Sequence, residues 1–419
     1  MVTGIGVGGT PAANGRRPRR PANPLAEPAA ASDPGDEAPA ATVEPASSTS
    51  IPAQPSRPTA RRARAPRRTG ATVAVTGAAG VIGSALVQRL VGHGDVAKVV
   101  AIDVRRGPTA GATWKVGDVR DPVVAQQITG ADAVVHLAVD WSLRTPSAER
   151  SALNVRGTQT VVTAAAAAGI ARVVVVTSAA VYGALADNPT PLPEDAPLQA
   201  PPEGIIADLL EIERVAEDAR RVHPGLTVTV VRPAALVGPG VDTLVTRHFA
   251  APRLLCIKDS APTWQFCHVD DLAAALVLAA LGAVTGVVTV GSDGYLVQQR
   301  VEDLSGMKRV EVSAAFAFAT AERLHRVGVS PAPASELAYV MYPLVVPSTR
   351  LRAAGWLPEH DNESCLRVVL DEVRGDYTLA GRRIGRRDAT VAGASAAGAT
   401  VAVLGAAAFV RAARRVRPR

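Results

Sequence analysis

Three glycines at a predicted strand-to-helix turn are the first residues whose spacing could do chemistry. Gly77, Gly80 and Gly83 lie in GAAGVIG, which follows the apolar run TVAV and opens a helix-like stretch. In such a turn the first glycine permits a tight bend, the second admits a pyrophosphate, and the third allows close packing of helix on strand. Free N–H groups and the positive end of the helix dipole attract phosphates. The motif therefore predicts dinucleotide binding.

Asp103 supports the same interpretation, because it follows Gly83 by 20 residues and ends the second apolar run, KVVAID. A carboxylate at this place can accept hydrogen bonds from an adenosine ribose, and it would repel a 2′-phosphate. It therefore favours NAD. Arg105 and Arg106 follow at once, so NADP stays open as the alternative.

The elements that must position these residues alternate between strand and helix. The strands are expected near 72–77, 98–104, 114–119, 132–138, 172–178 and 227–233, with helices near 78–94, 121–130, 152–169 and 205–222. The strands are nearly continuous apolar runs, which is typical of a parallel sheet covered on both faces. The predicted fold class is α/β, a Rossmann-type doubly wound parallel sheet.

The remaining chain divides by composition into four predicted parts. Residues 1–70 are a Pro/Ala/Arg-rich tail with too few bulky apolar residues to order, so we expect disorder there. Residues 71–240 form the NAD(P)-binding domain. Residues 241–380 form a smaller C-terminal substrate lobe, interleaved with it. Residues 389–410 form an apolar helix.

The 22 uncharged residues at 389–410 are long enough to span a bilayer, although most of them are small. Arginines flank both ends, and the positive-inside rule opposes moving the last nine residues across a membrane. The alternatives are a helix on an anionic membrane surface and a soluble Ala-rich helix. We expect a cytoplasmic protein with membrane contact through 389–410.

Charge and cysteine content limit the remaining function classes. The net charge of +7 resides in the tails, because residues 1–70 hold ten Arg against five acids and residues 382–419 hold nine Arg against one Asp. The body between them is acidic, so no nucleic-acid partner is expected. The three cysteines are widely spaced and form no CxxC, so neither a disulfide framework nor a metal site is expected.

Taken together, the motifs resemble those of the extended short-chain dehydrogenase/reductases, specifically the NAD-dependent epimerase/dehydratase family, over roughly residues 71–375. The matching segments are TGAAGVIG at 76–83, Gly117–Val119, His136–Ala138, Asn154–Thr158, Thr177–Gly183, Arg232–Pro233, His268–Asp271 and Gly355–Pro358. The resemblance implies NAD, a nucleotide-sugar-like ligand, and a homodimer through the helices near 152–168 and 205–222. The cofactor-binding residues it implies are Gly77, Ala79, Gly80, Val81, Ile82, Gly83, Asp103, Asp118, Val119, Leu137, Ala138 and Pro233.

The family's chemistry needs a Tyr and, four residues later, a Lys on the same helix face. The downstream Glu211 and Glu213 place that helix so that Ile205 and Leu209 stand at these two positions. None of the five tyrosines is followed four residues later by Lys. Ser178 is the one catalytic residue that the resemblance still implies.

Two function classes follow. One is a binding protein with non-standard or vestigial catalysis. The other is a working epimerase, dehydratase or reductase that uses a different proton donor. The candidate donors are Ser178, Tyr182, Asp208 and Glu211. Apolar residues from Ile205 to Ala219 form a stripe along the same helix. The simpler interpretation of this stripe is a helix face buried in the core.

Overall fold

The computed structural model describes residues 70–142 and 145–383, with side chains described up to Arg374. The predicted tail, apart from its last residue, and the predicted apolar helix at 389–410 lie outside the described residues. Among the residues that are described, no helix combines the length and the apolar character that a membrane crossing needs.

The centre of the protein is a seven-stranded sheet in the order β11-β6-β5-β4-β1-β2-β3. Every neighbouring pair in it is parallel. This confirms the predicted doubly wound α/β fold. The strands are β1 (Ala71–Thr76), β2 (Val96–Asp103), β3 (Thr113–Val116), β4 (Ala133–His136), β5 (Arg172–Val176), β6 (Thr227–Pro233) and β11 (Val287–Val290).

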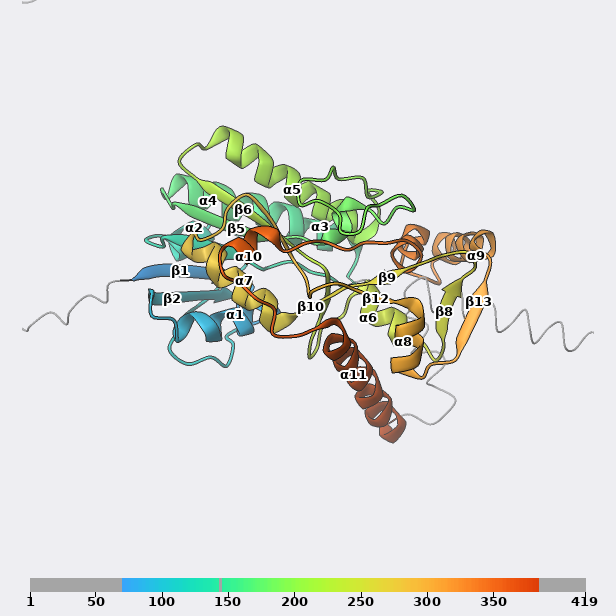
Figure 1. Ribbon diagram of the computed structural model, residues 1–419. Helices are drawn as coiled ribbons and strands as arrows, with labels where there is room; N and C mark the ends of the chain where they lie inside the picture. Colours follow the sequence, from blue (N-terminus) through green and yellow to red (C-terminus); the bar gives the residue numbers. More distant parts are fainter. Residues whose placement is uncertain (1–69, 143–144, 384–419) are drawn as a thin grey trace, which may run out of the picture. The chain divides into compact units, whose positions relative to one another are not determined.

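Helices cover both faces of this sheet, as Figure 1 shows with α1 on one side and α4 and α5 on the other. Alternate residues of one strand serve the two cores: Val73 and Val75 join the core beneath α1 and α7, whereas Ala74 joins the core beneath α2, α4 and α5. The bounds of these helices are α1 (Val81–Val91), α2 (Val124–Ile128), α4 (Gly157–Ala167), α5 (Gly204–Val222) and α7 (Val269–Leu281).

A third core lies among the elements that follow β6. The strands there pair in twos, as β7 with β10, β9 with β12 and β8 with β13. The strands are β7 (Ala235–Val237), β8 (Leu254–Ile257), β9 (Thr263–Trp264), β10 (Phe266–His268), β12 (Leu296–Val297) and β13 (Arg309–Val312). The helices are α6 (Leu244–Phe249), α8 (Gln298–Ser305), α9 (Ala314–Arg326), η3 (Ala334–Val340), α10 (Thr349–Ala353) and α11 (Asn362–Arg383).

Two segments differ from the expected elements. The helix expected over 152–169 is the end of a longer run, made of α3 (Ser147–Ser151), a π-helical turn (Ala152–Arg156) and α4. At the π-helical turn the Asn154 side chain exchanges hydrogen bonds with the backbone of Asp140. The run from Trp264 to Leu281 is predicted from its sequence as strand, loop and helix, but in the structure α7 begins directly after β10, with His268 as its cap.

Candidate functional site

A cavity of about 330 Å³ lies at the carboxyl ends of the central strands. Its walls come from the turns after β1, β4 and β5, the end of β6, the start of α5, and the segments around α6 and η3. In an open parallel sheet this is the edge at which ligands bind. Eight of the predicted site residues line it: Gly77, Gly80, Val81, Ile82, Gly83, Leu137, Ser178 and Pro233.

The three glycines of the loop are required for different reasons. Gly77 has a φ of +69°, and a Cβ there would lie 2.5 Å from the backbone of Leu137. A Cβ at Gly83 would lie 2.1 Å from the carbonyl oxygen of Gly77, so helix and strand could not pack as closely. At Gly80 the nearest atom to an added Cβ is 3.3 Å away. The fold therefore requires glycine at the first and third positions, whereas at the second a Cβ would make one tight contact with the Gly77 carbonyl oxygen and would also take space from a ligand.

The start of α1 leaves its amide groups open toward this cavity. Gly80 is the N-cap residue, and no side chain caps the helix. The first turn contains no acidic residue that would repel an anion. An uncapped amino-terminal turn with exposed glycine beside it fits the pyrophosphate of a dinucleotide.

Asp103 is tied to the glycine loop rather than pointing away from it. Its Oδ2 accepts a hydrogen bond from the amide of Ala79 at 2.9 Å. Arg105 closes the same corner by donating to the carbonyl oxygen of Ala79 at 3.1 Å. The carboxylate thus stands at the end of β2 beside the loop, which is where a ribose would meet it. The Arg105 guanidinium also places a positive charge beside this loop.

The remaining predicted cofactor residues lie outside the lining of the cavity. Asp118 accepts hydrogen bonds from the Arg120 guanidinium, which lower the pKa of the Asp118 carboxyl. Val119 is buried in the core beneath α4, and Ala138 packs against that core. The residues expected to bind the pyrophosphate therefore line the cavity, whereas those expected to bind the adenine do not.

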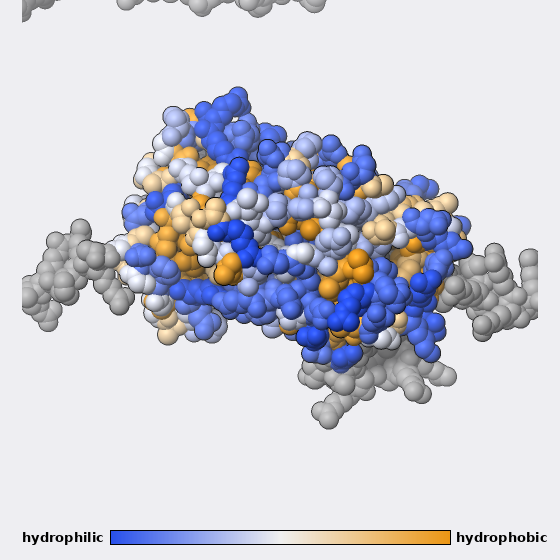
Figure 2. Space-filling view, viewed as in Figure 1, coloured by the Kyte–Doolittle hydropathy of each residue, from blue (hydrophilic) through white to orange (hydrophobic). Residues whose placement is uncertain are grey.

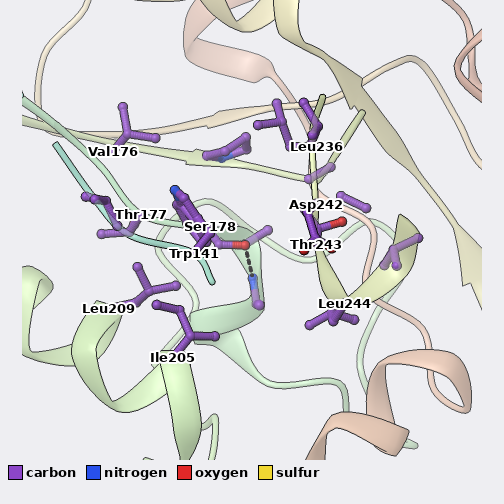
Figure 3. A pocket seen from close by; sticks show the side chains of 18 of the residues that line it. Trp141, Val176, Thr177, Ser178, Ile205, Leu209, Leu236, Asp242, Thr243 and Leu244 are labelled. Atoms are coloured by element: carbon purple, nitrogen blue, oxygen red, sulfur yellow. Dashed lines mark hydrogen bonds between the residues drawn. The ribbon is translucent and has the colours of Figure 1, made fainter. Parts of the chain in front are cut away.

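Ser178 stands at the turn after β5, where it caps the short 3-10 helix η2 (Ala179–Tyr182). Its hydroxyl oxygen accepts a hydrogen bond from the amide of Ala180 at 3.1 Å. Figure 3 shows Ser178 in the cavity between Ile205 and Leu209 on one side and the segment of Asp242 and Thr243 on the other. The hydroxyl is therefore placed to meet a ligand.

A buried carboxylate, that of Glu213, ties α5 to the central sheet. Glu213 makes two hydrogen bonds of 2.8 Å to the Arg232 guanidinium on β6 and accepts one from the Thr177 hydroxyl at 2.7 Å. One and two turns earlier, the helix directs Leu209 and Ile205 toward the cavity, where they are 0% and 8% exposed. The rest of the apolar stripe is buried in the core beneath α5. The stripe is thus a buried helix face, as the simpler interpretation of the sequence predicts.

Three of the four candidate proton donors are occupied elsewhere. Asp208 is 3% exposed and pairs with Arg150 at 2.8 Å. Glu211 pairs with Arg214 on the outer surface of the helix. The Tyr182 hydroxyl donates to a backbone carbonyl oxygen at 2.6 Å, and burial raises its pKa. Of these three residues, none lines the cavity.

The wall formed by α6 and η3 supplies ionisable side chains that the sequence analysis did not single out. Arg247 pairs with Asp242 at 2.7 Å, and both residues line the cavity. Glu336 and Tyr339 of η3 line it as well. Burial raises the pKa of Glu336 to about 7. No local motif marks these residues, because they belong to short elements between prolines.

One group of possible metal donors lies at the start of α7, where atoms of His268, Asp270 and His360 approach within 4.8 Å of one another. Each histidine already has a structural role. His268 Nδ1 accepts from the Asp270 amide at 3.2 Å, and His360 bonds to Asp271 at 3.1 Å. The two rings also stack at 3.8 Å. These contacts give each histidine a partner within the protein.

A match to a family model identifies the family to which this chain belongs. The model of the NAD dependent epimerase/dehydratase family matches residues 73–291, from β1 through the last strand of the central sheet. The chain belongs to this family. It also resembles an uncharacterized protein of Mycobacterium tuberculosis, which is 30% identical over 299 residues, or 68% of this chain and 79% of that protein. A dTDP-glucose 4,6-dehydratase of Streptomyces griseus is 30% identical over 47% of this chain and 65% of its own length.

Solved structures of epimerase/dehydratase family type have the same architecture. MoeE5 in complex with UDP-glucuronic acid and NAD is 26% identical, with a TM-score of 0.56 over 73% of this chain and 99% of that chain. The UDP-glucose 4-epimerase of Thermus thermophilus in complex with NAD is 20% identical, with a TM-score of 0.56 over 73% and 99%. The second likeness shows the fold alone.

Proposed function

We propose that this chain binds NAD along the glycine loop and holds a nucleotide-sugar-like ligand in the adjoining part of the cavity, with non-standard or vestigial catalysis. One observation carries the proposal: the cavity that contains the uncapped start of α1 also contains the apolar first turn of α5. The first fits a dinucleotide, and the second offers no phenol and no ammonium group.

The residues that would hold NAD are those that line the cavity or hydrogen-bond to its loop. The α1 amides beside Gly80 would bind the pyrophosphate, and Asp103 would bind the adenosine ribose. When bound, NAD supplies a hydride acceptor. MoeE5 was crystallised with NAD and UDP-glucose, which supports a nucleotide sugar as the ligand class. We assign that ligand to the predicted lobe at 241–380, and the dinucleotide to residues 71–240.

A working epimerase, dehydratase or reductase with a different proton donor is the second candidate. The observation that favours it is the buried Glu336 in the cavity wall. Fold and family do not decide between the two, because the same fold carries different activities.

Calorimetry with the full-length chain tests the proposal. We expect NAD to bind and NADP to bind more weakly, since Asp103 would face a 2′-phosphate. Reduction of bound NAD would then be followed with UDP-glucose, UDP-glucuronic acid and dTDP-glucose. Failure to bind either dinucleotide overturns the proposal, and turnover above about 1 s⁻¹ decides for the second candidate.

Assembly and location are part of the same proposal. We propose a cytoplasmic homodimer formed through α4 and α5, with membrane contact through residues 389–410. Figure 2 shows that the upper edge of the protein, where α5 lies, is mainly hydrophilic. A dimer through α5 would therefore use charged residues, because its apolar stripe is buried. Sedimentation of the purified chain and fractionation of cells that express chains 1–419 and 1–388 test both points.

A further inference from the structure

Glu336 is a buried carboxyl group that the family's chemistry does not use. It is 6% exposed, and it lines the same cavity as Ser178 and the glycine loop. Within the described residues its carboxyl group takes part in no hydrogen bond and no ion pair. Its oxygen atoms are not fully enclosed, because the residue borders the cavity, so a ligand in the cavity can reach the carboxyl group and supply its missing partner.

Two contacts at the start of η3 place it over the first turn of α5. The Ser335 hydroxyl donates to Glu203 Oε2 at 2.7 Å, directly before the helix begins. A Cβ atom on Gly204 would lie 3.2 Å from the ring of Pro333, so the two backbones are close. Glu336 follows at once, and it therefore enters the cavity beside the turn that carries Ile205.

The far end of η3 reaches the turn that carries Ser178. The Tyr339 hydroxyl donates to the carbonyl oxygen of Ala180 at 2.8 Å, and the amide of Ala180 donates to Ser178. A 3-10 helix has three residues per turn, so residues 336 and 339 share one face. Glu336 and Tyr339 thus lie on one face of η3, and they line the cavity that Ile205 and Ser178 also line.

The charged groups around Glu336 are already engaged. Arg247 of α6 pairs with Asp242 at 2.7 Å, and Arg150 of α3 pairs with Asp208 at 2.8 Å. Among the described residues, the ionisable groups that act on it are Arg247, Arg150 and Asp242, and Tyr339 lies beside it on η3. Because neither arginine forms an ion pair with Glu336, desolvation dominates, and the pKa of the Glu336 carboxyl rises to about 7. A group with such a pKa can exchange protons near neutral pH.

We propose that Glu336 is the proton-exchanging catalytic residue of this chain, acting on a hydroxyl group of a nucleotide-sugar-like ligand that Ser178 also contacts. The inference rests on the proposed binding of NAD, and it develops the second candidate function, a working enzyme with a different proton donor. The ligand's O–H proton passes to the Glu336 carboxylate as its C–O bond becomes a carbonyl. The hydrogen on the same carbon leaves with two electrons to an oxidised nicotinamide dinucleotide, so the ligand is oxidised and the dinucleotide reduced.

Tyr339 is the weaker candidate for the same part. Its hydroxyl is already donating to a backbone carbonyl oxygen, and burial raises its pKa far from neutrality. In the family's arrangement a lysine lowers the pKa of the catalytic phenol, and Leu209 offers no such charge. Tyr339 is therefore assigned to positioning the Ser178 turn.

The test compares the wild-type full-length chain with Glu336→Gln, Glu336→Asp and the control Glu322→Gln. Glu322 is an exposed carboxylate on α9 that pairs with Arg326 outside the cavity. NAD affinity is measured by calorimetry for all four proteins. UDP-glucose is then titrated into the NAD-saturated proteins in two buffers of different ionisation enthalpy, which counts the protons exchanged on binding. The rate of NAD reduction is recorded between about pH 5 and 9.

We expect the wild-type rate to rise through about pH 7, since the carboxylate is the proton acceptor. Glu336→Gln should lower the rate about 100-fold or more and abolish the proton exchange that accompanies UDP-glucose binding, while NAD affinity stays within about twofold. Glu336→Asp should keep a pH-dependent rate at a reduced level. The control should match the wild type.

The outcomes separate this inference from the function on which it rests. A wild-type chain that does not bind NAD overturns both. A chain that binds NAD, but reduces it with none of UDP-glucose, UDP-glucuronic acid and dTDP-glucose, overturns the assignment of Glu336 and leaves the binding function standing. An unchanged rate and pH profile in Glu336→Gln overturns the assignment as well.

Discussion

The start of α1 and the start of α5 face one cavity and offer it opposite chemistry. The first turn of α1 presents backbone amides beside an unprotected glycine, with no side chain to cap it. The first turn of α5 presents Ile205 and, one turn on, Leu209. Amides of the first kind suit an anionic cofactor, whereas the second surface can only pack against a ligand. Cofactor binding therefore depends on the start of α1, and the family's reaction depends on the start of α5. The start of α1 can be complete while the start of α5 lacks the family's usual catalytic groups.

The largest effect is expected where α5 is anchored. Glu213→Ala would leave the Arg232 guanidinium buried without its carboxylate, and breaking such a pair costs about 3–5 kcal/mol. Chemical denaturation measures the free energy of unfolding. Glu217→Ala on the same helix is the control, because it removes a mainly exposed carboxylate. Equal losses in the two variants would show that the buried pair does not hold the helix in register.

Glu336 should make the stability of the protein depend on pH. Its folded-state pKa of about 7 lies above the usual 4.5, so the folded protein keeps a proton that the unfolded chain releases. Stability is therefore full below about pH 4.5 and falls as the pH rises to about 7, by an amount on the order of 3 kcal/mol. Glu336→Gln should remove this part of the slope in denaturation curves recorded across that range. Parallel curves for the two proteins would contradict it.

Gly80→Ala should weaken NAD binding while the fold is kept. An added methyl group would make one tight contact, 3.3 Å from the Gly77 carbonyl oxygen, which a small shift of the loop can relieve, and it would stand where the pyrophosphate approaches the backbone. We expect about a tenfold loss of affinity, or about 1.4 kcal/mol. Gly94→Ala, in open space beyond the other end of α1, is the matched control. Unchanged NAD affinity in Gly80→Ala would show that the pyrophosphate does not bind at this loop.

The smallest effect is expected on the outer face of α5. Arg214→Ala removes exposed pairs with Glu211 and Asp218, and exposed pairs of this kind add little to stability. We expect no measurable change in the unfolding midpoint of the monomer. If sedimentation shows a dimer that this variant dissociates, the charged face of α5 is its interface.

The parts that could be predicted from sequence depend on local spacing. The glycine turn, the β-branched strands and the register of α5 follow from neighbours within a few residues, so their pattern is visible in the chain. Asp208 and Glu211 are plausible proton donors from the sequence because they lie on the same predicted helix as Ile205 and Leu209. Only the fold shows that one meets Arg150 and the other meets solvent. Glu336, on a 3-10 helix, lines the same cavity as Ile205 although 131 residues separate them, and no local periodicity in the sequence predicts such an approach.

The order of the central sheet also has a consequence for synthesis of the chain. β6 ends at Pro233, but its outer neighbour β11 begins only at Val287, after the elements from β7 to α7 have been made. Until that strand emerges from the ribosome, the valine-rich edge of β6 has unpaired amides and carbonyls, which invites pairing with another chain. Expression fragments that stop near residue 240 would keep this edge open permanently. Fragments that extend past Val290 allow the sheet to close.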